Sequence, residues 1–247
     1  MLKKCKNRVV IVLVWAVIVY DEVEYLQATV ERLQRHDKPI YVMCDVNSPE
    51  AVKNYLVDAS VEHSEYAFDG DYSKMRNELD KRVKLLDRYQ WIFQLDADEL
   101  PAENLVLEVE DILAGAGVTK VNVCRFNCYS EQLSDIDVKA IFESVKTGEI
   151  YHMERLWNVE PVEMCKRLYR LDAGVEWHGR IHEWPEGNDD DWADLPMESD
   201  FCLWHEKTQE RQEMQNAKYE EYEEHRELAS QIAEQMAWKQ SIRESLE

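Results

Sequence analysis

The feature that most constrains the fold is a run of twelve consecutive apolar residues, Val9 to Tyr20. Basic residues precede it, as in a signal peptide, but Asp21-Glu22-Val23-Glu24 follows directly, without a small-residue cleavage site. Twelve residues are too few to cross a bilayer as a helix, and the run is rich in Val and Ile, which favour strands. A strand buried on both faces fits best, and such strands occur in parallel sheets that helices cover.

Helical and strand patterns alternate along the next hundred residues. Val23, Leu26, Val30 and Leu33 recur at three- and four-residue spacing, which predicts a helix over 22–34. The same criteria predict strands at 39–44, 91–95, 119–126, 166–171 (one face exposed) and 201–204, and helices around 49–56, 73–88 and 105–113. Parallel neighbours need crossover connections, so this order predicts an α/β fold with a mostly parallel, Rossmann-like sheet flanked by helices.

Acidic residues follow the apolar strand predicted at 91–95. Asp96, Asp98 and Glu99 come directly after Leu95, and Pro101 then ends the regular ladder. Ligands of open α/β sheets bind at the carboxyl ends of the strands, and clustered carboxylates bind hard cations such as Mg²⁺ or Mn²⁺. The alternative is an ordinary acidic turn, so residues elsewhere must distinguish the two.

Composition argues against several classes of protein. The chain has 51 acidic and 29 basic residues, a formal charge of −22, which disfavours nucleic acid and anionic membranes as partners, although a local basic groove could coexist with it. Neither GxGxxG nor GxxxxGKS occurs, so dinucleotide and P-loop sites lose their main support. Six cysteines without a CxxC pair favour reduced thiols and a cytoplasmic location. We expect no transmembrane segment.

A second group of reactive side chains lies late in the chain. His178, Arg180, His182 and Glu183 fall within six residues, which favours a functional site over a surface turn. A regular strand would place His182 and Glu183 on opposite faces. Glu183 can therefore act beside the others only if the chain turns there.

Four segments together resemble the family 2 glycosyltransferases, which have the GT-A fold: Arg76-Asn77, Leu95 to Glu99, Arg167 to Arg170, and Gly179 to Glu183. The resemblance covers about residues 9–218. Within the family, the chain is most similar to small bacterial and phage-like enzymes related to lipopolysaccharide-core glucosyltransferases.

The resemblance implies a metal site. Asp96 and Asp98 would form the Asp-x-Asp motif that holds Mn²⁺ or Mg²⁺ against the diphosphate of a nucleotide-sugar donor, with Asp96 also near the ribose. His205 would complete the metal shell or contact the diphosphate. The alternative for His205 is a structural histidine.

The resemblance also implies nucleotide-binding and catalytic residues. Asp45 and Arg76 would contact the nucleotide base, His182 would belong to the donor site, and Glu183 would be the general base of an inverting enzyme. Arg76 could instead form a helix-surface ion pair with Asp80, four residues on. The chain departs from the family after the first strand, where Tyr20-Asp21-Glu22 replaces an Asn-Glu-Glu-like turn.

We therefore expect a metal-dependent glycosyltransferase that moves a sugar, with inversion, from a nucleotide sugar to a hydroxyl acceptor. A UDP sugar is the expected donor and a saccharide or lipid-linked saccharide the expected acceptor. The expected domains are a GT-A-like catalytic domain at 1–205, with a nucleotide half to about 100 and an acceptor half from about 101, and a helical tail at 206–247. Alternatives are a nucleotidyltransferase, a glycosyltransferase acting on hydroxymethylated DNA bases, and a non-catalytic scaffold.

Overall fold

The computed structural model describes residues 11–128, 162–188, 191–206, 213 and 217. The chain divides into two units, Met1–Glu206 and Lys207–Glu247, and nearly all described residues belong to the first. Most of the tail predicted at 206–247 and the region 129–161 lie outside the described residues, so the predicted domain division stays a prediction. Among the described helices, none is long and apolar enough to cross a membrane.

The first unit alternates strands and helices as predicted, and then continues mainly as strands. In chain order its elements are β1 (Leu13–Val19), α1 (Val23–Arg35), β2 (Ile40–Asp45), α2 (Glu50–Asp58), β3 (Glu62–Tyr66), α3 (Tyr72–Leu85), β4 (Trp91–Asp96), β5 (Glu99–Pro101), α4 (Glu103–Ala116), β6 (Lys120–Cys128), β7 (Val162–Arg170), β8 (Glu176–His178), β9 (Trp184–Glu186), β10 (Ala193–Asp194), a 3-10 turn (Ser199–Phe201) and β11 (Cys202–Glu206).

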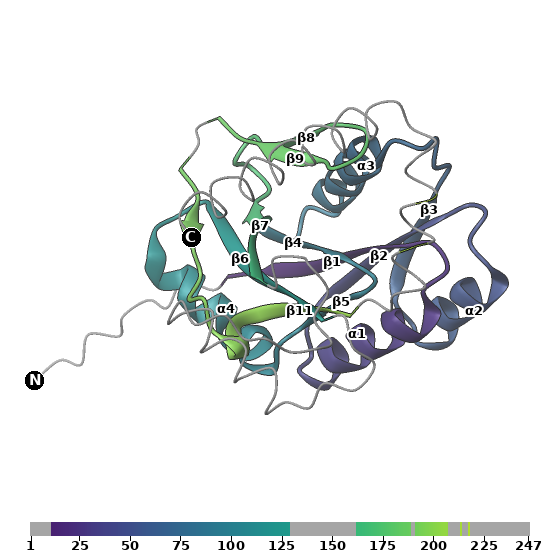
Figure 1. Ribbon diagram of the computed structural model, residues 1–247, viewed down its shortest axis with the longest axis horizontal. Coiled ribbons are helices and arrows are strands. Elements are labelled where there is room, and N and C mark those ends of the chain that lie inside the picture. The colour runs from purple at the N-terminus through teal and green to yellow at the C-terminus, as the bar shows by residue number, and fades with distance from the viewer. Residues whose placement is uncertain (1–10, 129–161, 189–190, 207–212, 214–216, 218–247) are drawn as a thin grey trace, which may run out of the picture. The chain divides into compact units, whose positions relative to one another are not determined.

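One sheet organises the unit, with strand order β3-β2-β1-β4-β7-β6-β11-β5 and β10 beside β6 (Figure 1). Strands β3, β2, β1 and β4 run parallel to one another, whereas β7 is antiparallel to both β4 and β6. The predicted fold class, an α/β fold with a mostly parallel sheet flanked by helices, is confirmed. Strands β8 and β9 form a separate antiparallel hairpin.

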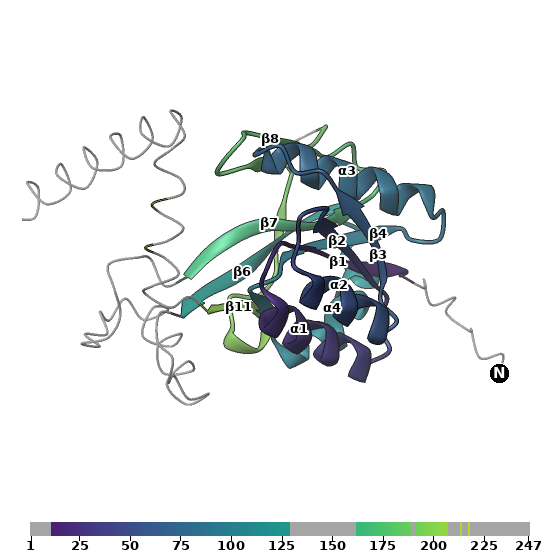
Figure 2. The same cartoon turned by 90° about the vertical axis from the view of Figure 1, so that its right-hand side faces the viewer.

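Helices cover both faces of the sheet, as the unbroken apolar run of β1 requires. Figures 1 and 2 show α1, α2 and α4 on one face, and α3 with the β8–β9 hairpin on the other. Residues of β1 alternate between the two cores, with Trp15 and Val17 in one and Val14 and Ala16 in the other. Trp15 stacks on Phe93 of the adjacent strand, with ring centroids 4.5 Å apart.

The short strands β5, β8, β9 and β10 were not predicted, and two longer strands, β7 and β3, also differ from the sequence prediction. The prediction that β7 has an exposed face is wrong, because Leu168 is buried in the core on one face of the sheet and Tyr169 in the core on the other. Strand β3 was not predicted, because its residues are polar and alternate between half-buried and exposed at the edge of the sheet. Both differences arise from tertiary position, which local periodicity does not report.

The end of α4 offers a matched test of backbone conformation. Gly117 caps the helix in the left-handed region, at φ 66°, whereas Gly115 lies inside the helix, and a Cβ at either position would meet no atom within 4 Å. We expect Gly117→Ala to lower the free energy of unfolding by about 1–2 kcal/mol through backbone strain. Gly115→Ala should raise it by about 0.5–1 kcal/mol through helix propensity. Urea unfolding measures both, and equal effects would contradict the assigned helix end.

Candidate functional site

The turn after β4 directs three carboxylates to different partners. Asp96 ends β4, Asp98 lies in the turn, and Glu99 begins β5, where it pairs with His205 of β11 in the sheet register. Glu99 Oε2 accepts a hydrogen bond of 2.9 Å from the backbone nitrogen of Asp96, which closes the turn. The predicted location of these acids, at the carboxyl end of a buried strand, is observed.

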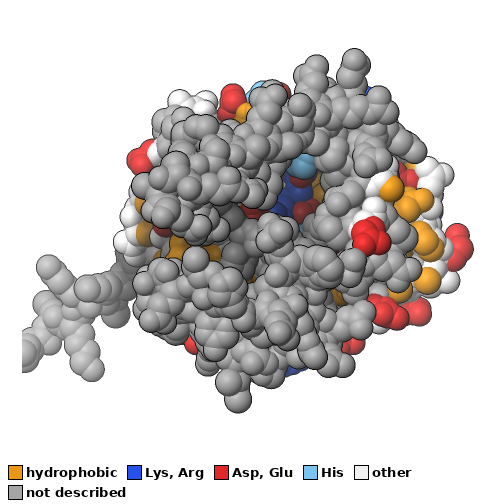
Figure 3. Space-filling view, viewed as in Figure 1, with side chains coloured by type: hydrophobic (Ala, Val, Ile, Leu, Met, Phe, Trp, Pro, Cys, Tyr) orange, Lys and Arg blue, Asp and Glu red, His pale blue; other side chains and the backbone are white. Residues whose placement is uncertain are grey.

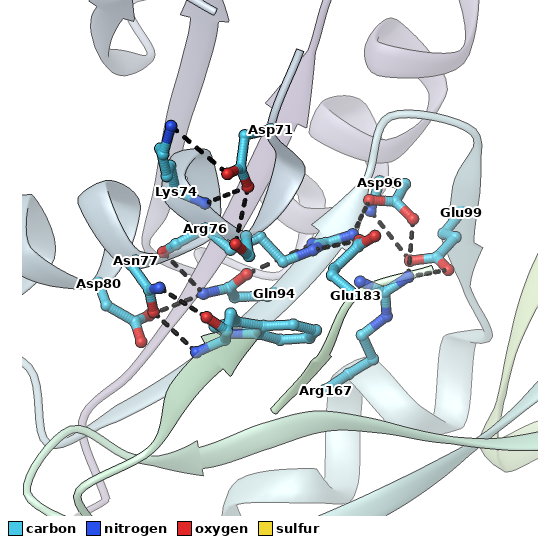
Figure 4. Close-up of polar contacts among 12 residues, drawn as sticks. Asp71, Lys74, Arg76, Asn77, Asp80, Gln94, Asp96, Glu99, Arg167 and Glu183 are labelled. Carbon is cyan, nitrogen blue, oxygen red and sulfur yellow. Dashed lines mark hydrogen bonds and ion pairs between the residues drawn. The ribbon is translucent and has the colours of Figure 1, made fainter. Parts of the chain in front are cut away.

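Asp96 and Glu99 belong to a set of alternating acidic and basic side chains that we call the ion-pair network. In order of contact it comprises Glu183, Arg76, Asp96, Arg167, Glu99, Arg125 and Glu163. Its members come from α3, β4, β5, β6, β7 and the β8–β9 hairpin, so distant segments converge here (Figure 4). Figure 3 shows basic and acidic side chains lying together near the centre of one face of the molecule.

Arg76 is the link between α3 and the sheet. Its Nε donates to Glu183 Oε1 at 2.7 Å, and its Nη2 donates to Asp96 Oδ1 at 2.6 Å. The guanidinium carbon lies 4.7 Å from the ring centroid of Trp177, a cation–π contact. Arg76 is almost fully buried, so the alternative of a helix-surface ion pair with Asp80 is wrong.

Asp96 is held by two arginines at once. Its Oδ1 accepts from Arg76, and its Oδ2 accepts from Arg167 Nη2 at 2.7 Å. Burial raises the pKa of Asp96, but the charges of Arg167, Arg76 and Arg125 outweigh burial and hold this pKa well below its usual range. Asp96 is therefore ionised at neutral pH, with both oxygens occupied by guanidinium groups.

A cluster of buried polar side chains holds Arg76 in place. Gln94, which points inward from β4, accepts from Arg76 Nη1 at 3.3 Å and donates to Asp80 Oδ1 at 2.7 Å. The Tyr169 hydroxyl donates to Asp80 and accepts from Trp177 Nε1 at 2.8 Å. The Trp177 ring that stacks on Arg76 and the Gln94 amide that binds Arg76 therefore belong to one hydrogen-bonded cluster.

Asp98 faces His205 rather than the arginines. Its Oδ2 lies 3.3 Å from His205 Nε2, and His205 Nδ1 lies 2.8 Å from Asn127 Oδ1. The Asn127 amide is oriented by its Nδ2, which donates to Glu163 Oε1 at 3.5 Å. With Asn127 presenting its Oδ1 to Nδ1, Nε2 is the ring nitrogen that faces the Asp98 carboxylate, either as an N–H that donates to it or as a lone pair that a cation can share.

Two acceptor atoms this close repel each other unless a proton or a metal cation lies between them. The nitrogen and oxygen of His205 and Asp98 fit a divalent cation. In the described part of the chain no group of three or more His, Cys, Asp or Glu side chains forms a metal cluster. Mg²⁺ sites often use only one or two protein carboxylates and take further ligands from substrate phosphates. Asp96, the third expected ligand, lies against arginines instead.

The β8–β9 hairpin places Glu183 as the sequence argument required. The chain turns between the two strands, with left-handed backbone at Gly179 (φ 85°) and His182 (φ 57°). The turn brings the Glu183 carboxylate to Arg76, while the side chain of His182 is exposed. A Cβ at Gly179 would lie 2.5 Å from the Trp184 ring, so the turn admits little other than glycine.

Asp45 lies outside the ion-pair network. It ends β2 and accepts hydrogen bonds from the backbone nitrogens of Asn47, at 2.6 Å, and Phe68, at 2.8 Å. Both carboxylate oxygens therefore hold the loops that follow β2 and β3. The structure does not bring Asp45 together with the other expected site residues.

Sequence reasoning did not identify several members of the site. It gave no role to Arg125, Asn127, Glu163 or Gln94, and it placed Arg167 in a family motif without assigning it a function. Gln94 carried a usable signal, because a polar residue inside the apolar run Trp91–Leu95 must find a buried partner. The others have no local pattern, since their partners lie 26 to 78 residues away.

No family model and no curated protein matches the chain. Similar solved structures are those of S. aureus TarS 1–349 alone (TM-score 0.45, 9% identity), with UDP (0.47, 8%) and with UDP-GlcNAc (0.46, 9%). They cover 78–79% of this chain, which spans only 58–60% of theirs. At these TM-scores the function of this chain has to be inferred from its own residues.

The buried cluster predicts an unusual pH dependence of stability. Burial raises the pKa of Asp80 to about 6, despite hydrogen bonds from Gln94 and Tyr169. A pKa above the unfolded value means that Asp80 stabilises the fold below about pH 4 and that this contribution is lost as pH rises to about 6. Relative to Asp80→Asn, the wild type should lose about 3 kcal/mol of unfolding free energy across that interval. Urea unfolding at several pH values measures the difference, which should not be constant.

Proposed function

We propose that this protein transfers a sugar from a nucleoside-diphosphate sugar to a hydroxyl acceptor. The observation that carries the proposal is the convergence of Arg76, Asp96 and Glu183, from three separate elements, at the carboxyl end of β4. The strand order reverses at β1, since β2 lies on one side and β4 on the other. Ligands of open α/β sheets bind at such a switch point. The resemblance of the motifs to family 2 glycosyltransferases supports the same assignment.

Glu183 is proposed as the general base. One of its oxygens accepts from Arg76, which fixes the carboxylate, while Oε2 has no hydrogen-bond partner in the described part of the chain. An acceptor hydroxyl that reaches Oε2 can lose its proton there as its oxygen attacks the anomeric carbon. The bond from that carbon to the diphosphate breaks, which inverts the configuration.

Asp98 and His205 are the residues proposed to hold Mn²⁺ or Mg²⁺. The nitrogen and oxygen atoms of these two side chains that face each other support this assignment. When bound, the cation would stabilise the negative charge that develops on the departing nucleoside diphosphate. Asp96 would then position Arg76 and Arg167 and contact the nucleotide. We further propose that His182 and Asp45 belong to the donor-binding site.

A donor screen tests the metal site. Thermal unfolding of the wild type is followed with UDP, GDP, CDP and TDP in Mn²⁺, and then with glucose, galactose and N-acetylglucosamine esters of the nucleotide that binds. A nucleotide at about 100 times its Kd should stabilise the protein by about 2.7 kcal/mol. Asp98→Asn should lose the Mn²⁺-dependent part of this stabilisation, whereas Asp58→Asn, at an exposed residue, should retain it.

The screen also separates the alternatives. No stabilisation by any of these nucleotides, with or without Mn²⁺, would contradict the proposed function and favour the non-catalytic scaffold. Release of pyrophosphate from a nucleoside triphosphate would indicate a nucleotidyltransferase. Binding to hydroxymethylated duplex DNA at low salt would indicate the DNA-modifying alternative.

The role of Glu183 has a separate test. Glu183→Gln keeps an acceptor oxygen for Arg76 but cannot take a proton, so transfer should fall by about 100-fold or more. Affinity for the nucleoside diphosphate alone should change little. Glu186→Gln is the matched control, because Glu186 is an exposed carboxylate of the same hairpin. A wild-type transfer rate in Glu183→Gln, measured by release of nucleoside diphosphate with acceptor present, would exclude Glu183 as the base.

A further inference from the structure

Arg167 has one guanidinium nitrogen that the ion-pair network does not use. Its Nη2 donates to Asp96 Oδ2 at 2.7 Å and to Glu99 Oε1 at 3.1 Å. The whole residue is only 7% exposed. Its Nη1 is buried and has no hydrogen-bond partner among the described residues. A buried donor without a partner is costly, so proteins retain one chiefly where water or a ligand can bind.

The unused donor lies close to a carboxylate that has an unused acceptor. In Figure 4 the guanidinium of Arg167 lies between Glu99 and Glu183. Its Nη2 is directed at Glu99, and, against the effect of burial, the charge of Glu183 raises the pKa of Arg167, so Glu183 lies close to this guanidinium. Within the described part of the chain, Arg167 and Glu183 form no direct ion pair, and Glu183 Oε2 has no hydrogen-bond partner. A group placed between them can accept from Nη1 and donate to Oε2.

The local charge restricts the chemistry of that group. The network has three guanidinium groups and four carboxylates, a formal charge of −1. A phosphate or carboxylate beside Arg167 would add negative charge next to Glu183 and be repelled. A hydroxyl group is neutral and both accepts and donates hydrogen bonds, as the two protein atoms require.

We propose that Arg167 Nη1 and Glu183 Oε2 together bind one hydroxyl group of a saccharide, which makes Arg167 a specificity-determining residue. This inference rests on the proposed function. The hydroxyl belongs either to the sugar being transferred or to the acceptor. In the second case it is the hydroxyl that gives its proton to Glu183 while its oxygen bonds to the anomeric carbon and the diphosphate leaves.

The test compares Arg167→Lys with the wild type. A lysine ammonium keeps the positive charge beside Asp96 and Glu99 but has no second rigid branch to replace Nη1. Arg170→Lys is the matched control, because Arg170 is three residues further along β7 and pairs with exposed Asp172. Glu183→Gln serves as a second variant, since it alters the other side of the same contact.

In the donor arm, calorimetry measures binding of the nucleotide sugar that stabilises the wild type most in the screen, and of its monodeoxy analogues. In the acceptor arm, a non-transferable phosphonate analogue of that nucleotide sugar saturates the protein. Methyl β-glucoside, methyl β-galactoside and their monodeoxy analogues are then titrated. One deoxy analogue should bind the wild type and Arg170→Lys at least about tenfold more weakly than its parent. Arg167→Lys and Glu183→Gln should each bind this deoxy analogue and its parent with equal affinity.

The arm in which this discrimination appears identifies the saccharide. If both variants discriminate as the wild type does, or if no deoxy analogue in either arm is discriminated, the Arg167 inference is overturned while the proposed function stands. If the wild type binds no nucleotide sugar at all, the proposed function and the inference fail together.

Discussion

The site depends on burying the guanidinium groups of Arg76 and Arg167 at the end of a central strand. A charge taken out of water is tolerated only when opposite charges and hydrogen bonds replace the lost solvent. Asp96 supplies one partner to each arginine, and Glu183 and Glu99 supply the second. Moving any one of these carboxylates away would leave a buried guanidinium group without its ion-pair partner. The elements that carry the carboxylates are therefore fixed relative to one another.

The sheet topology explains why these residues meet. Strand β7 runs antiparallel between β4 and β6, with Phe93 opposite Leu168, and this register brings Arg167 to the level of Asp96. The short strand β5 turns back against β11, which carries Glu99 to the arginines and Asp98 to His205. The hairpin β8–β9 closes the arrangement from the other face through Trp177 and Glu183. The acidic turn therefore divides into an arginine-bound part and a candidate metal-binding part.

Local patterns predicted β1, β2 and β4 of the parallel half and the location of the acidic turn, because burial of β1 and β4 on both faces leaves a strong apolar signal. The same patterns described β7 wrongly. Its alternating basic and apolar residues are the pattern of an exposed strand. In the folded protein, however, Asp96 and Glu99, about 70 residues earlier, pair with Arg167, which allows it to be buried. Asn127 shows the same limit, since only the folded register of β6 against β11 places it beside His205.

The most direct test of the account is the ³¹P NMR spectrum of UDP titrated with the protein in Mg²⁺. If the carboxyl end of β4 binds a nucleoside diphosphate through Asp98 and His205, both phosphorus resonances should broaden and shift with wild-type protein, and Asp98→Asn should largely abolish the effect. Phosphorus resonances that stay sharp and unshifted at saturating protein, or that respond equally to Asp98→Asn, would contradict the account.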